Sequence, residues 1–265
     1  MSGQVITITS GKGGVGKTTA TANLGIALAR LGQRVAVVDA DIGLRNLDVI
    51  LGLENRVVYD LVDVVEGACG LRQALVKDKR VEGLYLLPAA QSRDKTAVNP
   101  AQMSALCRQL RQDFAYILID SPAGIEQGFR NAVVPADRVI VVTTPEIAAV
   151  RDADRVIGLL EAEGKEDVML LLNRVDTRMV RRGDMMSVED VLEILAIPLL
   201  GVVPEDEAIL VASNRGAPVV LDGRSPTAGA FERVARRLLG EDVPVVLPEP
   251  QGGVLDWLGK LWGRG

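Results

Sequence analysis

The sequence predicts an α/β fold with a doubly wound, mostly parallel sheet and helices on both faces. Short apolar segments alternate with helical patterns along nearly the whole chain, which is typical of strands joined by crossover helices. The strand segments are apolar at consecutive positions, as in residues 115–119 (AYILI), which is the pattern of a sheet covered on both faces. A glycine-rich stretch follows the first strand and leads directly into the first helix.

The expected elements follow one another in regular order. The strands cover residues 5–9, 34–39, 84–88, 116–120, 138–143, 168–173 and 199–203. The helical stretches include residues 17–31, 100–111, 147–161, 187–195 and 226–239. Ligands of doubly wound sheets bind outside the carboxyl ends of the strands. Residues 11–18, Asp39 and Asp120 all fall at that edge, so we expect the functional site there.

The composition narrows the chemistry that the chain can perform. Of 265 residues, 48% are hydrophobic and 25% are charged, which suffices for a sizeable core. The net charge of −5 argues mildly against a general nucleic-acid binder. Histidine is absent, which removes histidine-based catalysis and metal ligation, and Cys69 and Cys107 lack the spacing of a disulfide framework or metal site.

We expect the body of the protein in the cytosol. The chain enters the apolar residues 5–8 (VITI) without the basic region and apolar core of a signal peptide. It contains no uninterrupted apolar stretch long enough to span a bilayer.

Residues 11–18 (GKGGVGKT) match the phosphate-loop pattern G-x-x-x-x-G-K-[ST], between a β-branched segment and a helix-favouring one. In such a loop, backbone N–H groups and the positive end of the helix surround a phosphate chain. Lys17 is expected to reach the β- and γ-phosphates, and the Thr18 hydroxyl to ligate Mg²⁺. A plain glycine-rich turn is the alternative, but the context favours a fold of the P-loop NTPase type that binds ATP and Mg²⁺. The nucleotide-binding residues expected here are Gly11, Lys12, Gly13, Gly14, Val15, Gly16, Lys17, Thr18 and Thr19.

Three carboxylates follow the ends of two strands beside this loop. Asp39 and Asp41 follow the second strand, and Asp120 follows a run of apolar residues. A single aspartate at a strand end is usually a turn residue or a helix cap, but three that converge on one edge indicate a metal site. Asp120 is expected to ligate Mg²⁺ through a water or from its outer coordination shell. Asp39 and Asp41 are candidates both for orienting the attacking water and for the outer shell of the metal, and the sequence leaves these two roles undivided.

With these motifs the chain resembles the ParA/MinD family of ATPases. Residues 12–19 (KGGVGKTT) are similar to the family's deviant phosphate loop, which carries a second lysine, here Lys12. The resemblance extends to residues 39–48 (DADIGLRNLD), 120–126 (DSPAGIE), 182–185 (RGDM), 188–195 (VEDVLEIL) and 203–206 (VPED), so it covers nearly the whole chain.

The resemblance implies an ATPase that forms a face-to-face homodimer around two ATP molecules. Lys12 would then reach the phosphates bound by the partner chain, much as an arginine finger does. A solvated loop lysine is the alternative. The catalytic residues implied are Lys12, Lys17, Asp39 and Asp41, the metal ligands Thr18, Asp39 and Asp120, and the adenine neighbours Asn173, Pro204, Glu205 and Asp206.

The end of the chain predicts a membrane-targeting element. A P-loop ATPase domain (residues 1–240) is followed by a proline- and glycine-rich tether (residues 241–253) and an amphipathic helix (residues 254–265). Both tryptophans lie in this helix, where they suit a membrane–water interface. A helix docked on the protein's own core is the alternative. The expected phospholipid contacts are Leu255, Trp257, Leu258, Leu261 and Trp262.

The MinD branch of the family implies a septum-positioning ATPase, peripheral on the cytoplasmic face of the membrane when ATP is bound. Its partners would be a MinC-like division inhibitor and a MinE-like activator, with no nucleic acid expected. The implied partner surface comprises Arg45, Asn46, Asp48, Asp152 and Asp154, although Asp152 and Asp154 read equally well as a charged helix face.

Three other functions occur among proteins with related sequences. A DNA-partitioning ATPase would use the arginines Arg174, Arg178, Arg181 and Arg182, and a flagellar-number regulator would share both the ATPase and the tail. An iron–sulfur ATPase is rejected, because no cysteine follows Cys107.

Overall fold

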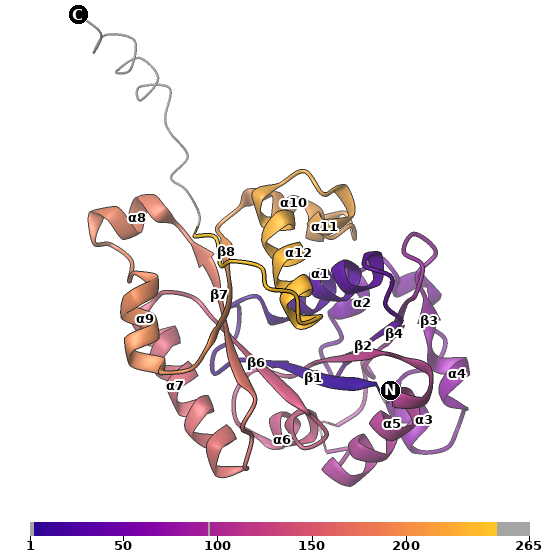
Figure 1. Ribbon diagram of the computed structural model, residues 1–265. Coiled ribbons are helices and arrows are strands. Elements are labelled where there is room, and N and C mark those ends of the chain that lie inside the picture. The colour runs from indigo at the N-terminus through magenta and orange to yellow at the C-terminus, as the bar shows by residue number, and fades with distance from the viewer. Residues whose placement is uncertain (1–2, 95, 248–265) are drawn as a thin grey trace, which may run out of the picture.

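One twisted sheet lies between two layers of helices (Figure 1) in the computed structural model, which describes residues 3–94 and 96–247. In that part of the chain the sheet has eight strands in the order β3-β4-β2-β5-β1-β6-β7-β8. Every adjacent pair is parallel except β3 with β4. This topology confirms the doubly wound, mostly parallel α/β fold.

All seven predicted strands are present. The strands are β1 (Gln4–Thr9), β2 (Val35–Asp39), β3 (Val76–Lys77), β4 (Leu84–Leu87), β5 (Tyr116–Asp120), β6 (Arg138–Thr143), β7 (Val168–Val175) and β8 (Leu199–Pro204). The additional strand, β3, has two residues and pairs antiparallel at the sheet edge, so it carries no periodic pattern. The predicted strand 168–173 continues to Val175 through Arg174, which has a φ of 59°.

The helices divide between the two faces of the sheet. On one face α1 (Lys17–Arg30), α11 (Val219–Asp222) and α12 (Pro226–Leu238) pack together, with α2 (Leu47–Ile50) and α10 (Glu207–Asn214) beside them. On the other lie α5 (Pro100–Asp113), α6 (Gln127–Val133), α7 (Ile147–Ala162) and α9 (Val188–Leu195). The remaining described helices are α3 (Leu61–Val65), α4 (Leu71–Ala74), α8 (Thr177–Arg182) and the 3₁₀ turn η1 (Glu54–Arg56).

The central strands are buried on both faces. Ile6 and Ile8 of β1 pack into the core beneath α1 and α12, whereas Val5 packs into the core beneath α5. Successive side chains of a strand point to opposite faces, so each face needs an apolar residue at alternate positions. The consecutive apolar runs in the sequence therefore follow from helices covering both sides.

The segment after α12 folds back along the edge strand β8. The Arg237 guanidinium donates from Nε to the Val243 carbonyl (2.7 Å) and from Nη1 to the Leu200 carbonyl (2.5 Å), and it also donates to the Pro244 carbonyl. The first part of the expected tether is thus fixed to the sheet edge. The rest of the tether and the expected helix at 254–265 lie outside the described residues. Within the described part, no helix is both long and apolar enough to cross a membrane.

Two helix glycines test whether the α1–sheet contact limits side-chain size. A Cβ at Gly25 of α1 would lie 2.6 Å from Cγ1 of Val37 in β2, whereas one at Gly158 of α7 would meet nothing within 4 Å. Gly158→Ala should raise the free energy of unfolding by about 1 kcal/mol through helix propensity. Gly25→Ala should lower it by about 1–2 kcal/mol, because overpacking outweighs the same gain. Urea denaturation of both variants measures the difference, and stabilisation by both would contradict the packing argument.

Candidate functional site

The phosphate loop connects β1 to α1 in a conformation that depends on glycine. Gly14 and Gly16 have φ angles of +80° and +99°, which side chains rarely adopt. A Cβ at Gly16 would also lie 2.3 Å from Nδ2 of Asn173. Gly16 caps α1 without a side-chain hydrogen bond, so the N–H groups of the first turn remain for a ligand. The loop and the helix start together form an anion-binding cradle.

Lys17 points into the protein from the first position of α1. It is 8% exposed, and its Nζ lies 3.0 Å from Oγ of Ser10, which in turn donates to the Lys12 carbonyl at 2.7 Å. Burial lowers the pKa of Lys17, while the charges of Asp120 and Asp41 oppose that shift. Ser10 therefore holds the ammonium against the loop. Nothing in the motif spacing indicated this role for Ser10.

Asp39 and Asp120 face each other across the β2–β5 ladder, where they are register partners. Burial raises the pKa of Asp120 to about 8, and the neighbouring Asp39 adds to the shift, whereas a hydrogen bond from Thr18 and the charge of Lys17 lower it. Burial likewise raises the pKa of Asp39 to about 6. Below pH 8 the site without metal therefore keeps a proton on Asp120, and a divalent cation bound at this edge would favour release of that proton.

The two carboxyls differ in how their oxygens are used. Asp39 accepts backbone N–H groups from Asp41 (3.0 Å), Asn46 (3.1 Å) and Leu47 (3.1 Å), so it anchors the segment that leads into α2. Asp120 accepts the Thr21 hydroxyl at 3.3 Å. Asp120 with Thr18 is thus better placed than Asp39 to face a metal.

The donor set fits a Mg²⁺ held mainly by its nucleotide. The described residues contain no group of three histidine, cysteine or acidic side chains that could hold a metal alone. Mg²⁺ in phosphate sites keeps several waters and takes one or two protein ligands together with the phosphates. Thr18 and Asp120 would supply those protein contacts.

Lys12 points away from the cradle. Its side chain is 42% exposed, and its Nζ lies 3.5 Å from a carboxylate oxygen of Glu146, the residue that precedes α7. An exposed pair at this distance contributes little to stability. The two lysines of the loop therefore diverge, one buried at the cradle and one available to another molecule.

The helix α7 packs directly on the phosphate loop. A Cβ at Gly11 would lie 2.1 Å from the carbonyl oxygen of Asp152, so only glycine fits at this crossing. Asp154, two residues on, is exposed on the same helix.

The part of the predicted partner surface at residues 45–48 is less exposed to solvent. Asn46 is exposed, but Asp48 is buried and binds Nε of Arg45 at 2.6 Å. Asp48 therefore holds Arg45 in place in this conformation rather than presenting a carboxylate to a partner.

The expected adenine neighbours lie at the ends of β7 and β8. The Asn173 side chain is buried and donates from Nδ2 to the Val15 carbonyl at 2.8 Å, and its Oδ1 has no hydrogen-bond partner. Glu205 is bound by Arg174 at 2.8 Å. Asp206 caps α10 and accepts the Thr227 hydroxyl at 2.8 Å. Asn173 is thus the one of these polar side chains with an open buried acceptor, and it touches the phosphate loop.

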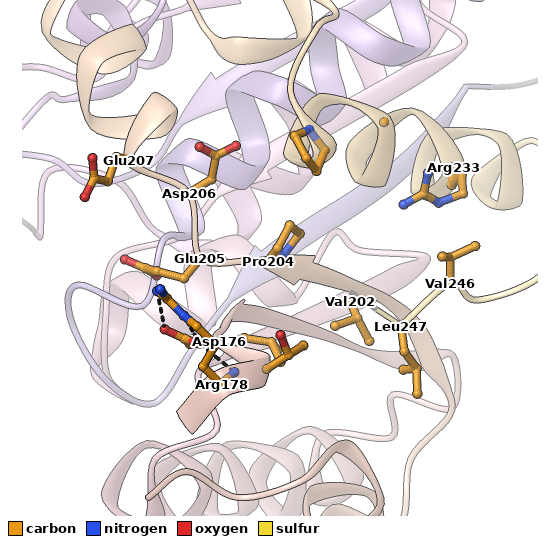
Figure 2. A pocket seen from close by; sticks show the side chains of 14 residues that line it. Asp176, Arg178, Val202, Pro204, Glu205, Asp206, Glu207, Arg233, Val246 and Leu247 are labelled. Atoms are coloured by element: carbon orange, nitrogen blue, oxygen red, sulfur yellow. Dashed lines mark hydrogen bonds and ion pairs between the residues drawn. The ribbon is translucent and has the colours of Figure 1, made fainter. Parts of the chain in front are cut away.

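A cavity of about 750 Å³ lies beside the end of β8 (Figure 2). Its walls include Pro204, Glu205 and Asp206 from the predicted site, and Val246 and Leu247 from the segment after α12. Among the described residues that line it, none belongs to the phosphate loop. The expected membrane residues at 255–262 lie outside the described chain.

Comparison with known proteins gives a consistent result. Residues 6–219 match the family model for the CobQ/CobB/MinD/ParA nucleotide binding domain. The septum site-determining protein MinD of Bacillus subtilis (strain 168) is 55% identical over 264 residues, 98% of each chain. A chain of the MinC:MinD cell division protein complex of Aquifex aeolicus is 50% identical, with a TM-score of 0.86, over 92% of this chain and 98% of that one. The Pyrococcus horikoshii OT3 septum site-determining protein MinD, complexed with Mg-ADP, is 31% identical with a TM-score of 0.80, over 91% and 99%.

The buried carboxyls predict an unusual pH dependence of stability. Because Asp120 has a pKa of about 8 when folded, against about 4 when unfolded, the folded state retains a proton that the unfolded state releases. That contribution is complete below pH 4 and is lost as the pH rises through 8. The free energy of unfolding of the nucleotide- and metal-free protein should therefore fall between pH 6 and pH 9, and less steeply in Asp120→Asn. Urea titrations across this range measure both slopes, and parallel curves would contradict the assignment.

Proposed function

This chain belongs to the CobQ/CobB/MinD/ParA family of nucleotide-binding proteins, and we propose that it is an ATP-dependent dimerising ATPase that acts at the membrane to position the division septum. It is a Mg²⁺-dependent ATPase related to septum site-determining proteins. Dimer formation, membrane binding and the interactions with regulators are the parts that we propose.

The position of Lys12 carries the proposal of a dimer. Lys12 lies on the phosphate loop, but its ammonium is partly exposed and forms a long ion pair with Glu146 (3.5 Å). A cation so placed can reach phosphates bound by a second copy facing this edge. Charge supplied by a partner stabilises phosphoryl transfer and makes hydrolysis depend on association.

The residues within one chain would bind and orient the nucleotide. The backbone of the loop and Lys17 would hold the β- and γ-phosphates, and Mg²⁺, when bound with Thr18 and Asp120, would neutralise phosphate charge. Asp39 fixes the backbone of Asp41, which places Asp41 near the cradle as the candidate for orienting water. The unpartnered Oδ1 of Asn173 offers an acceptor for the exocyclic amine of adenine, which guanine lacks at that position.

The tail supports a membrane switch. As a helix, residues 254–265 would place their apolar side chains on one face, and they carry a net charge of only +1. One such helix binds a membrane weakly, whereas two joined in a dimer bind about 10²–10⁴ times better through effective concentration. ATP would thus recruit the protein from the cytosol to the cytoplasmic face of the membrane, and hydrolysis would release it.

The proposed partners are a MinC-like division inhibitor and a MinE-like activator of hydrolysis. A solved relative forms a MinC:MinD complex, which supports the first. The exposed positions of α7, including Asp154, together with Asn46, are the surface we propose for them.

The structure weakens the case for DNA partitioning. Arg174, Arg178 and Arg182 of the basic cluster pair with Glu205, Asp176 and Asp184 respectively. Their charge is therefore largely balanced within the protein, which leaves less to attract nucleic-acid phosphates.

Lys12→Ala should separate ATP binding from association. The variant should bind ATP with near-normal affinity, because Lys17 and the loop backbone remain, but should lose ATP-dependent dimer formation and stimulated turnover. Light scattering with ATP and Mg²⁺ measures association, and Lys17→Ala, which should lose binding itself, is the matched control. Normal dimer formation by Lys12→Ala would refute the role in trans.

Truncation after Gly253 should abolish vesicle binding while preserving hydrolysis. Liposome co-sedimentation of the full chain should require ATP and should depend only modestly on anionic lipid, because the tail carries little charge. Pelleting of the truncated chain, or equal pelleting of the full chain with ADP, would count against the switch. Titration with duplex DNA in the same buffer tests the partitioning alternative.

A further inference from the structure

A second hollow, separate from the cradle, lies between the start of α7, α8 and the loop into α9. It has a volume of about 770 Å³. Its apolar side chains are Ile147, Met179, Val180, Met185 and Met186, with Pro145 beside them. Ile147 is 64% exposed, and the three methionines are half-buried. Methionines adapt their shape to apolar partners, so this groove suits an apolar helix face.

The groove is strongly acidic at its rim. Five acidic side chains and one arginine line it: Glu146, Asp176, Asp184, Asp190, Glu205 and Arg174. Asp184 and Glu205 remain about half exposed although they pair with Arg182 and Arg174. A ligand with an apolar face and basic residues beside it would complement both features.

The described chain ends at a cavity that adjoins this groove. Val246 and Leu247 wall the neighbouring cavity (Figure 2), and that cavity shares Asp176 and Glu205 with the groove. Arg237 fixes the approach by holding the Val243 and Pro244 carbonyls. The described chain therefore ends, after a fixed segment, at the cavity that shares a wall with the groove.

We propose that, in the ATP-free protein, residues 254–265 dock as a helix in this groove of their own chain. The seven residues 248–254 span about 23 Å when extended. A helix of residues 254–265 is about 18 Å long. Its apolar face, with Trp257, Leu258 and Leu261, would cover the methionines. Its polar face, with Asp256, Lys260, Arg264 and a net charge of +1, would lie towards the acidic rim.

If the proposed function holds, docking would also control when the helix can bind the membrane. Glu146 belongs to the groove and also pairs with Lys12, so the docked helix would lie beside the lysine that we assign to the partner chain. The helix would then be withheld from the membrane until a second copy binds at this edge. Docking itself requires neither lipid nor dimer.

The chain contains its own probe for this state. Both of its tryptophans, Trp257 and Trp262, lie in the segment that would dock. In the full chain without nucleotide or lipid, we expect tryptophan emission shifted to the blue and an acrylamide quenching constant several-fold below that of a free peptide of residues 248–265. Full exposure of the tryptophans would overturn the proposal.

Two groove variants and one matched control locate the site. Ile147→Asn and Met185→Gln should each raise the quenching constant towards that of the free peptide. Val58→Asn, at an apolar residue that is 78% exposed and does not line the groove, should leave it unchanged. If the tryptophans stay protected from acrylamide in both groove variants, the helix does not dock in this groove. If their protection grows with protein concentration, the groove binds the helix of a second copy. The quenching experiment contains no lipid, so exposed tryptophans would contradict docking but not membrane binding. Failure to bind vesicles would contradict the membrane proposal but not docking.

Discussion

The structure depends on burying opposite charges at one edge of its sheet. Asp39 and Asp120 meet there because β2 and β5 pair in that register, and Lys17 reaches the same edge from α1. Removing such charges from water is costly unless hydrogen bonds and counter-charges compensate. The protein provides three backbone donors for Asp39, the Thr21 hydroxyl for Asp120 and Ser10 for Lys17. The remaining repulsion between the carboxyls is relieved by a proton on Asp120, which Mg²⁺ could replace when nucleotide is bound.

The phosphate loop places its two lysines in different environments. Lys17 starts a helix whose first turn faces the cradle, and the surrounding core keeps it buried. Lys12 lies on the same loop but is partly exposed, and its Nζ is 3.5 Å from a carboxylate oxygen of Glu146. A single short sequence thus places one charge at the buried cradle and one charge at the surface.

The sequence was sufficient to predict seven strands of the sheet and the phosphate loop, because both leave strong local patterns. Seven strands could be predicted from apolar runs, whereas α2, α4 and α11 have four residues each and leave no period to detect. The cradle followed from glycine spacing. Ser10 and Glu146 were missed because their roles arise only when the loop folds against α1 and α7. Asp48 is buried for a similar reason: its partner Arg45 is held by the Asp39-anchored turn, a tertiary arrangement without a sequence signature.

Close packing makes the loop and α7 one mechanical unit. Gly11 lies so near the Asp152 carbonyl, and Gly16 so near Asn173, that a single methyl at either position would collide. Interiors packed at this density transmit displacement rather than absorb it. Glu146, at the start of α7, adds an ion pair to Lys12 on the same loop. A shift of α7 relative to β1 must therefore move the phosphate loop, the Lys12 ammonium or both, so the surface of α7 and the chemistry of the cradle are physically linked.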